Sequence, residues 1–186
     1  MTLVTTASID QLALVLDETE RLIAGVRPEQ WDAPTPCIEW TVRELVDHVV
    51  GGDRLFTAAL RGDEVATQRL ADEPATAFRA SADDLVAAFG LPGALAKVVT
   101  VPFGAVPGAV ALHLRITEIL VHGWDLGRAT GQPARFPDDI VEQELAFTQS
   151  ALADVPPERS PFAPPRPVAP DAPALDRLAG LLGRAV

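Results

Sequence analysis

Two histidines and one glutamate have the residue types and positions that suit a metal site. Glu118 and His122 are four residues apart in a segment of helical periodicity, so both side chains lie on one face of that helix. His48 lies two turns into another predicted helix, beside its apolar face. If these helices are neighbours, the three side chains meet. Two imidazoles and a carboxylate suit Zn²⁺, and also Ni²⁺, Fe²⁺ or Mn²⁺. Three protein ligands leave positions open for water or substrate, which is typical of a catalytic site.

Asp125 lies three residues beyond His122 on the same stripe of that helix. One interpretation is that it orients a ligating histidine through a hydrogen bond. An equally weighted one is that it forms a salt bridge with Arg128 or Arg115. Asp125 is also the one obvious general base for an alternative reaction, metal-dependent hydrolysis.

Three further residues compete for a place in this cluster. Cys37 suits a nucleophile or an additional ligand, but a small buried hydrophobe is the favoured interpretation. Glu44 stands four residues before His48 and raises a two-metal alternative, yet its position suits a helix cap, so one metal is favoured. His113 precedes His122 by nine residues, which places it on the opposite side of the helix.

Hydrophobic periodicity predicts the helices that position these residues. The four main helices are expected at about Ser8–Val26, Thr41–Leu60, Pro74–Phe89 and Gly108–Ala129. Thr41 and Glu44 form a capping box at the start of the second helix. Gly51 and Gly52 lie in its middle, where each costs about 1 kcal/mol against alanine. We therefore expect a close helix or a ligand to need the room there.

Smaller elements are expected around these four. A fifth helix, capped by Asp138 or Asp139, runs to about Leu152, and Val98–Val106 forms a short hairpin or an extended loop. Residues 155–173 hold 8 of the 17 prolines and are expected to lie along the surface. Asp171 is expected to cap a short helix over 172–182. The pattern predicts a single all-α domain over residues 1–186, an up-down-up-down four-helix bundle.

Composition excludes several classes of protein. The 186 residues carry a net charge of −11 with only 15 basic residues, which argues against nucleic acid or an anionic membrane surface as a partner. The single cysteine excludes an internal disulfide and paired-cysteine metal motifs. The sequence shows no signal peptide and no apolar segment of about 18 residues, so a cytoplasmic location is expected.

Three segments resemble a known family, the DinB/YfiT-like four-helix metalloproteins. They are the run from Pro34 to His48, the run from Glu118 to Leu126, and the tail from Pro170 to Arg184. The likeness is greatest to the actinobacterial branch that includes the metal-binding domain of mycothiol-dependent maleylpyruvate isomerase. The resemblance implies an up-down-up-down bundle with one divalent metal held by His48, Glu118 and His122.

The resemblance also implies thiol chemistry, because relatives activate a small thiol such as mycothiol at the metal. The predicted function is therefore a metal- and mycothiol-dependent S-transferase or isomerase acting on an electrophilic substrate, as a monomer or a homodimer. The alternatives are a metal-binding or sensor module without turnover, and the metal-dependent hydrolase. A roomy, partly apolar cavity beside the metal would favour chemistry, and a closed site would favour a binding role.

Overall fold

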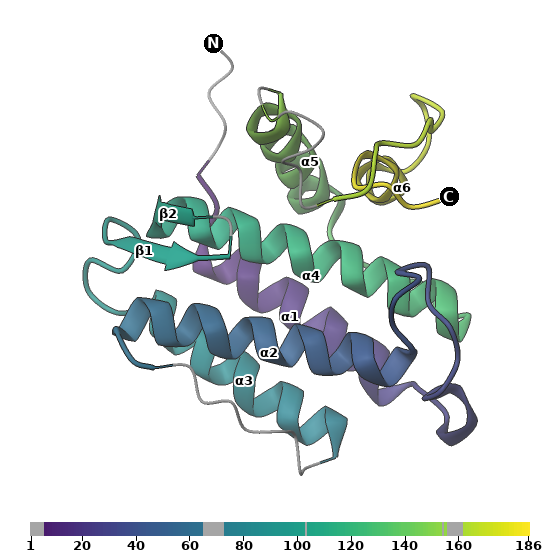
Figure 1. Ribbon diagram of the computed structural model, residues 1–186, viewed down its shortest axis with the longest axis horizontal. Coiled ribbons are helices and arrows are strands. Elements are labelled where there is room, and N and C mark those ends of the chain that lie inside the picture. The colour runs from purple at the N-terminus through teal and green to yellow at the C-terminus, as the bar shows by residue number, and fades with distance from the viewer. Residues whose placement is uncertain (1–5, 65–72, 103, 154, 156–161) are drawn as a thin grey trace.

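The computed structural model describes residues 6–64, 73–102, 104–153, 155 and 162–186. This part of the chain forms helices and one hairpin (Figure 1). In chain order the elements are α1 (Ile9–Ala24), the short 3₁₀ helix η1 (Pro28–Gln30), α2 (Val42–Arg61), α3 (Pro74–Phe89), β1 (Val98–Val101), β2 (Gly104–Pro107), α4 (Gly108–Thr130), α5 (Asp138–Leu152) and α6 (Ala174–Leu181).

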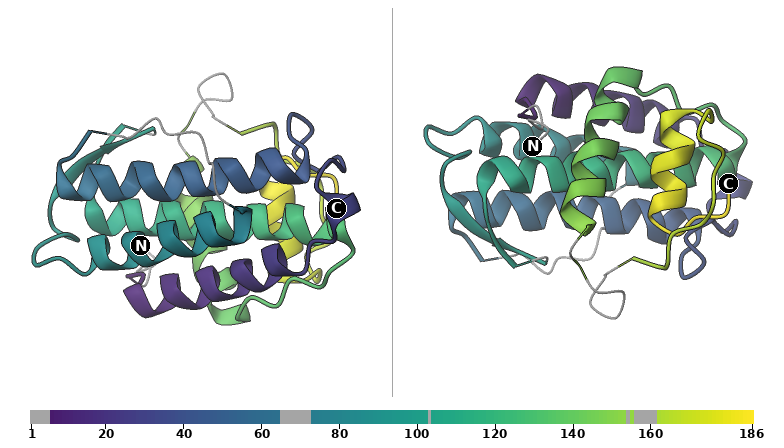
Figure 2. Two further views of the ribbon diagram at one scale, coloured as in Figure 1. Left: turned by 90° about the horizontal axis from the view of Figure 1, so that it is seen from below. Right: turned by 90° about the horizontal axis from the view of Figure 1, so that it is seen from above.

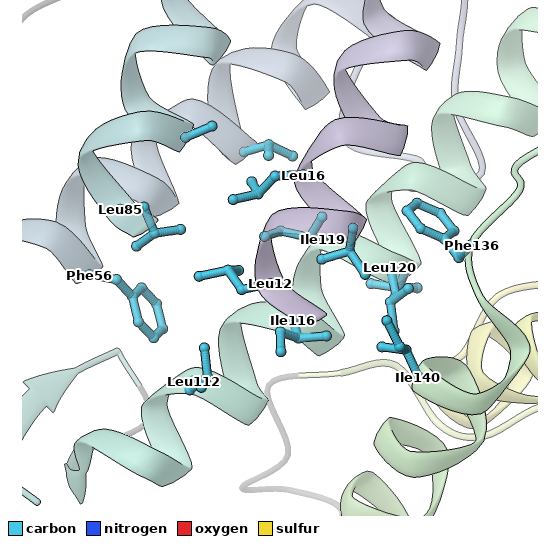
Figure 3. Packing of buried hydrophobic residues seen from close by; sticks show 14 of the residues in the cluster. Leu12, Leu16, Phe56, Leu85, Leu112, Ile116, Ile119, Leu120, Phe136 and Ile140 are labelled. Atoms are coloured by element: carbon cyan, nitrogen blue, oxygen red, sulfur yellow. The ribbon is translucent and has the colours of Figure 1, made fainter. Parts of the chain in front are cut away.

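The first four α-helices form the predicted all-α bundle, which is confirmed. In it α1 and α2 both contact α3 and α4. Apolar side chains of the four helices fill the space between them, among them Leu12, Phe56, Leu85 and Ile116 (Figure 3). The helices α5 and α6 lie side by side across the outer face of α4 (Figure 2). The core thus leaves the two long helices α2 and α4 in direct contact.

The direction of α3 differs from the predicted up-down-up-down order. Ser81 of α3 donates to Asp53 of α2 at 2.9 Å, and further along both helices Arg61 binds Asp84 at 3.0 Å. The second pair lies further along the chain in both helices, so α2 and α3 run in the same direction. The 12 residues between them can span about 40 Å when extended. That exceeds the length of about 30 Å expected for the 20-residue α2, so the chain is long enough to return before α3 begins.

The capping box at the start of α2 is confirmed. The Thr41 hydroxyl accepts from the Glu44 backbone N–H at 3.4 Å, and the Thr41 N–H donates to the Glu44 carboxylate at 2.8 Å. Glu44 is exposed and engaged with Thr41 in this cap. The helix ends at Arg61 and is capped by Gly62, whose φ of 83° is the left-handed conformation that favours glycine.

The predicted aspartate caps of the last two helices are wrong. Pro137 occupies the N-cap of α5, and Asp138 and Asp139 lie in its first turn, where they interact favourably with the helix dipole. Pro173 occupies the N-cap of α6, so that helix covers 174–181 rather than 172–182, and Asp171 does not cap it. A residue that precedes proline is disfavoured in the helical conformation, which explains why Ala172 stays outside.

Of the two interpretations of Val98–Val106, the hairpin is the one observed. Strands β1 and β2 pair antiparallel, with Val99 opposite Val106, and Pro102 lies between the strands.

In the proline-rich segment, residues 156–161 lie outside the described residues, and the half-buried Val168 contacts Gly180 of α6. In the described ranges, the structure contains no helix with both the length and the apolar character that a membrane span requires.

Candidate metal centre

The structure brings two of the three predicted ligands together, one from α2 and one from α4. The rings of His48 and His122 lie 5.0 Å apart between centroids, in an edge-to-face arrangement with an angle of 79°. Trp40 stacks on His48 with its ring centroid at 4.1 Å, and its distance to the His122 ring is 5.7 Å. The ring of Trp40 therefore borders both imidazoles.

The loop before α2 holds Trp40 in place. The N–H groups of Val42 and Arg43 donate to the carbonyls of Ala33 and Trp31, at 3.0 and 2.9 Å. The Thr35 hydroxyl donates to the carbonyl of Trp40 at 2.9 Å. These bonds fold residues 31–41 back on themselves as a closed, ordered loop. Trp40 thus sits one residue before the cap of α2, within reach of the ring of His48.

Burial and neighbouring charges favour the neutral form of His48. Burial is the main cause that lowers the pKa of His48 to about 3, and the nearby His122, Arg115 and Arg184 add to it. A neutral imidazole keeps a nitrogen lone pair, which a metal ligand needs.

Asp125 determines which nitrogen of His122 is available. Its carboxylate lies 3.1 Å from Nδ1 of His122, and since a carboxylate accepts, Nδ1 carries the proton. In the neutral ring the lone pair then resides on Nε2. This is the arrangement in which a carboxylate orients a metal-ligating histidine.

The ion pair predicted for Asp125 with Arg128 or Arg115 is wrong, because its partner is Arg184. Arg184 donates to both oxygens of the wholly buried Asp125, at 3.3 and 2.9 Å. Arg128 instead lies over the ring of Trp124 at 4.9 Å. Sequence reasoning missed Arg184, since it lies 59 residues away from Asp125 and no local pattern connects them.

Glu118 is engaged by an arginine on its own helix. Its carboxylate accepts from Nη1 of the wholly buried Arg115 at 3.0 Å. Arg115 also binds the buried Asp53, at 2.8 Å, and donates to the carbonyl of Val49 at 2.7 Å. The glycine predicted to make room in α2 does so for this side chain, since a Cβ at Gly52 would lie 2.8 Å from Cζ of Arg115.

The donor set therefore fits a metal ion in two of its three members. His48 and His122 offer adjacent imidazoles, whereas one oxygen of the Glu118 carboxylate is paired with Arg115. Within the part of the chain that the structure describes, no group of three or more His, Cys, Asp or Glu side chains is placed to hold a metal ion. Completing the set requires a movement of Glu118.

The remaining candidates lie outside the histidine pair. His113 binds Glu144 at 2.8 Å and accepts from the backbone N–H of Ala7 at 3.1 Å, so it belongs to a separate buried cluster on α4 and α5. Cys37 is half-buried against the core, and burial is the main cause that raises the pKa of its thiol. Nearby Arg184 opposes that rise and Asp125 adds to it. A raised pKa disfavours the thiolate that nucleophilic attack requires.

Among the described residues, α4 borders a small cavity and a larger hollow. The cavity of about 30 Å³, room for a water or two, borders Glu118 and is otherwise lined mainly by apolar residues of α4, α5 and the C-terminal segment. The hollow of about 640 Å³, which is within the size range of ligand pockets, is lined by Trp124, Arg128 and Asp176 among others. That hollow is lined by none of His48, Glu118 and His122.

These features define a helical bundle with a candidate metal site between α2 and α4. The family model described as the mycothiol maleylpyruvate isomerase N-terminal domain matches residues 12–127, more than half of the chain. The chain belongs to this family. The match confirms the resemblance found in the sequence, and it covers His48, Glu118, His122 and Asp125 but not Arg184.

The chain also has relatives of similar length. Two proteins of Mycobacterium tuberculosis, the uncharacterized proteins MT0763 (strain CDC 1551 / Oshkosh) and Rv0738 (strain ATCC 25618 / H37Rv), are each 36% identical to this chain over 174 residues. The alignment covers 91% of this chain and 93% of each relative.

Two crystal structures of the mycothiol-dependent maleylpyruvate isomerase, one of them a histidine-to-alanine mutant, have a similar fold. The TM-scores are 0.60 for the isomerase and 0.62 for the mutant, at 19% and 17% identity. The similarity covers 76% of this chain and 68% of each of those chains. At this level of identity the likeness shows the fold alone.

Proposed function

We propose that this protein binds one divalent metal ion through His48, Glu118 and His122 and uses a small thiol, mycothiol, in an isomerisation or S-transfer reaction. The observation that carries the proposal is the contact between His48 and His122, in which Asp125 leaves Nε2 of His122 as the free nitrogen. Membership of a family named for a mycothiol-dependent isomerase supports the choice of thiol. Zn²⁺ is the metal that this donor set suits best, with Ni²⁺, Fe²⁺ or Mn²⁺ as alternatives.

A divalent metal bound there would lower the pKa of a coordinated thiol, so that the nucleophilic thiolate would form near neutral pH. The protein's own residues prepare the site for it. Asp125 holds the ring of His122 in one tautomer, and Arg184 holds Asp125. Trp40 covers one face of His48 and excludes water from it.

Two alternatives remain as second candidates. The cavity beside Glu118, at about 30 Å³, is small for an organic substrate, which supports a protein that holds a metal without turnover. Metal-dependent hydrolysis would need Asp125 as a general base. Both oxygens of Asp125 accept hydrogen bonds and the residue is wholly buried, which supports an orienting role instead.

The first test is the metal content of untagged protein, measured by elemental analysis beside His48→Ala and His122→Ala. The proposal predicts one divalent metal per chain in the parent and a loss in both variants. Cys37→Ser is the matched control and keeps the metal, because Cys37 is no ligand in this scheme. Absence of metal in the parent, even after incubation with Zn²⁺, Ni²⁺ or Fe²⁺, would mean that the three residues are structural polar groups.

The second test addresses the thiol. Metal-loaded protein is incubated with mycothiol and a panel of epoxides, enones and activated rings, and thiol adducts and isomerised products are detected by mass spectrometry. Products that depend on the metal, on mycothiol and on His122 are expected. Metal binding without any product across the panel would favour the binding module.

A further inference from the structure

Arg115 binds one oxygen, Oε2, of the carboxylate that would be the third ligand of the proposed metal site. Glu118 stands one turn before His122 on α4, yet its carboxylate is bound to Nη1 of Arg115 at 3.0 Å. The Glu118 side chain is 17% exposed, whereas that of Arg115 is wholly buried. Of these two partners, Glu118 is the one with room to move.

Arg115 is held in place by contacts that do not involve Glu118. Its Nε and Nη2 bind Oδ1 of Asp53, at 3.0 and 2.8 Å, and Nη2 also donates to the carbonyl of Val49. Asp53 in turn accepts from the hydroxyl of Ser81 at 2.9 Å. Gly52, which has no side chain, leaves the room that the guanidinium fills. The guanidinium is therefore a fixed donor that presents one arm, Nη1, to Glu118.

We propose that Arg115 and a divalent metal ion compete for the carboxylate of Glu118. The inference rests on the proposed function, because it takes Glu118 as the third ligand beside the two histidines. In the metal-free protein the carboxylate lies on Arg115. Metal binding draws it away, and a buried Nη1 loses its charged acceptor, which opposes binding. Arg115 thus raises the metal concentration that the site needs before it fills.

The charge balance of the cluster gives the proposal a second, opposite consequence. Asp53 and Glu118 are two carboxylates that share one guanidinium. When Asp53 is neutral, Glu118 becomes the main counter-charge of Arg115 and is held more firmly. When residue 115 lacks the nitrogen Nη1 that binds Glu118, the carboxylate of Glu118 is released.

The experiment measures Zn²⁺ affinity of the full chain by competition with a chromophoric chelator, with circular dichroism as a check of folding. Arg115→Lys keeps a buried positive charge for Asp53 but lacks the second arm of the guanidinium, and it is expected to bind Zn²⁺ about tenfold more tightly. Asp53→Asn is expected to bind Zn²⁺ more weakly than the parent. Arg128→Lys, the same substitution elsewhere on α4, is the matched control and leaves the affinity unchanged.

Opposite shifts in the two variants distinguish competition from a general loosening of the fold, which would move both affinities downward. Equal or weaker binding by Arg115→Lys overturns the proposal, and weaker binding would make Arg115 a residue that presents Glu118 to the metal. If Arg115→Lys does not fold, the side-chain ¹⁵N signals of Arg115 in the parent replace it. Those signals are expected to move when Zn²⁺ saturates the site, and unchanged signals overturn the proposal.

The two proposals fail in different ways. Zn²⁺ binding that depends on His48 and His122 but is indifferent to Arg115→Lys overturns only the competition. Absence of Zn²⁺ binding in the parent and in both variants overturns the competition together with the proposed metal site.

Discussion

Arg184 donates to both oxygens of Asp125, at 3.3 Å to Oδ1 and 2.9 Å to Oδ2. Asp125 also accepts from Nδ1 of His122 at 3.1 Å. These contacts connect the C-terminal segment to one of the two histidines of the candidate site. Arg184 gives the buried Asp125 a positively charged partner, and the carboxylate of Asp125 in turn orients the ring of His122.

The first prediction concerns Arg184. Arg184→Gln is expected to weaken Zn²⁺ binding by about tenfold, since outer partners of metal ligands typically contribute that much. Arg184→Lys retains the positive charge, and its Zn²⁺ affinity is expected to lie between those of the parent and Arg184→Gln. The measurement is chelator competition. Arg177→Gln is the control, because Arg177 lies on α6 and binds Glu142 rather than Asp125. An equal loss in that control would mean that a loosened α6 causes the effect.

Trp40 gives the second prediction. Its stack on His48, with ring centroids 4.1 Å apart, is of the kind that contributes about 0.5–1.5 kcal/mol. Trp40→Ala is expected to weaken Zn²⁺ binding by up to about tenfold, and Trp40→Phe to retain most of it. Cu²⁺ bound at the site is expected to quench the emission of Trp40 in the parent. Trp40→Phe removes most of that quenching and Trp124→Phe does not, and the reverse result would place the bound metal elsewhere.

The sequence predicted those features of the fold that depend on residues close together in the chain. Periodicity located the helices of the bundle, and the Thr41–Glu44 box located the start of α2 because both partners lie within one turn. The predicted cap at Asp171 failed for an equally local reason, the preference of Ala172 before Pro173 for extended backbone. Buried residues of α5 and α6 join the same apolar cluster as the bundle, and the single domain over residues 1–186 stays a prediction.

Longer-range features left no such pattern in the sequence. The apolar stripe of a helix does not encode its direction, so it could not reveal that α2 and α3 are parallel. The pairs Asp125–Arg184 and Asp53–Arg115 connect residues 59 and 62 positions apart, through contacts that exist only once the bundle has formed. The paired glycines of α2 signalled a need for room, but its occupant, the side chain of Arg115, became evident only from the packing.

The third prediction is a pH dependence centred on Glu18. Burial alone would raise the pKa of Glu18, but hydrogen bonds from the side chain of Arg21 and the backbone N–H of Arg135 lower it below its ordinary value of 4.5. The folded state then binds fewer protons than the unfolded state around that pH. The resulting stabilisation is complete above about pH 4.5 and is lost as the pH falls through the folded pKa.

Glu18→Gln should therefore be less stable than the parent at pH 6.5, and the gap should narrow towards pH 3. Urea denaturation across this range measures the gap as a difference in the free energy of unfolding. A gap of constant size would show that ionisation of Glu18 does not contribute to stability.

The two glycines in the middle of α2 give the last prediction. Gly51 has no atom within 4 Å of the position where a Cβ would lie, so Gly51→Ala is expected to stabilise the protein by up to about 1 kcal/mol through helix propensity. At Gly52 a Cβ would lie 2.8 Å from Cζ of Arg115, which cannot retreat without depriving the buried Asp53 of its positively charged partner. Gly52→Ala is expected to destabilise by about 1–3 kcal/mol, the usual cost of overpacking. Urea denaturation of the matched pair checks both signs, and a Gly52→Ala variant as stable as Gly51→Ala would show that the guanidinium of Arg115 is free to rearrange.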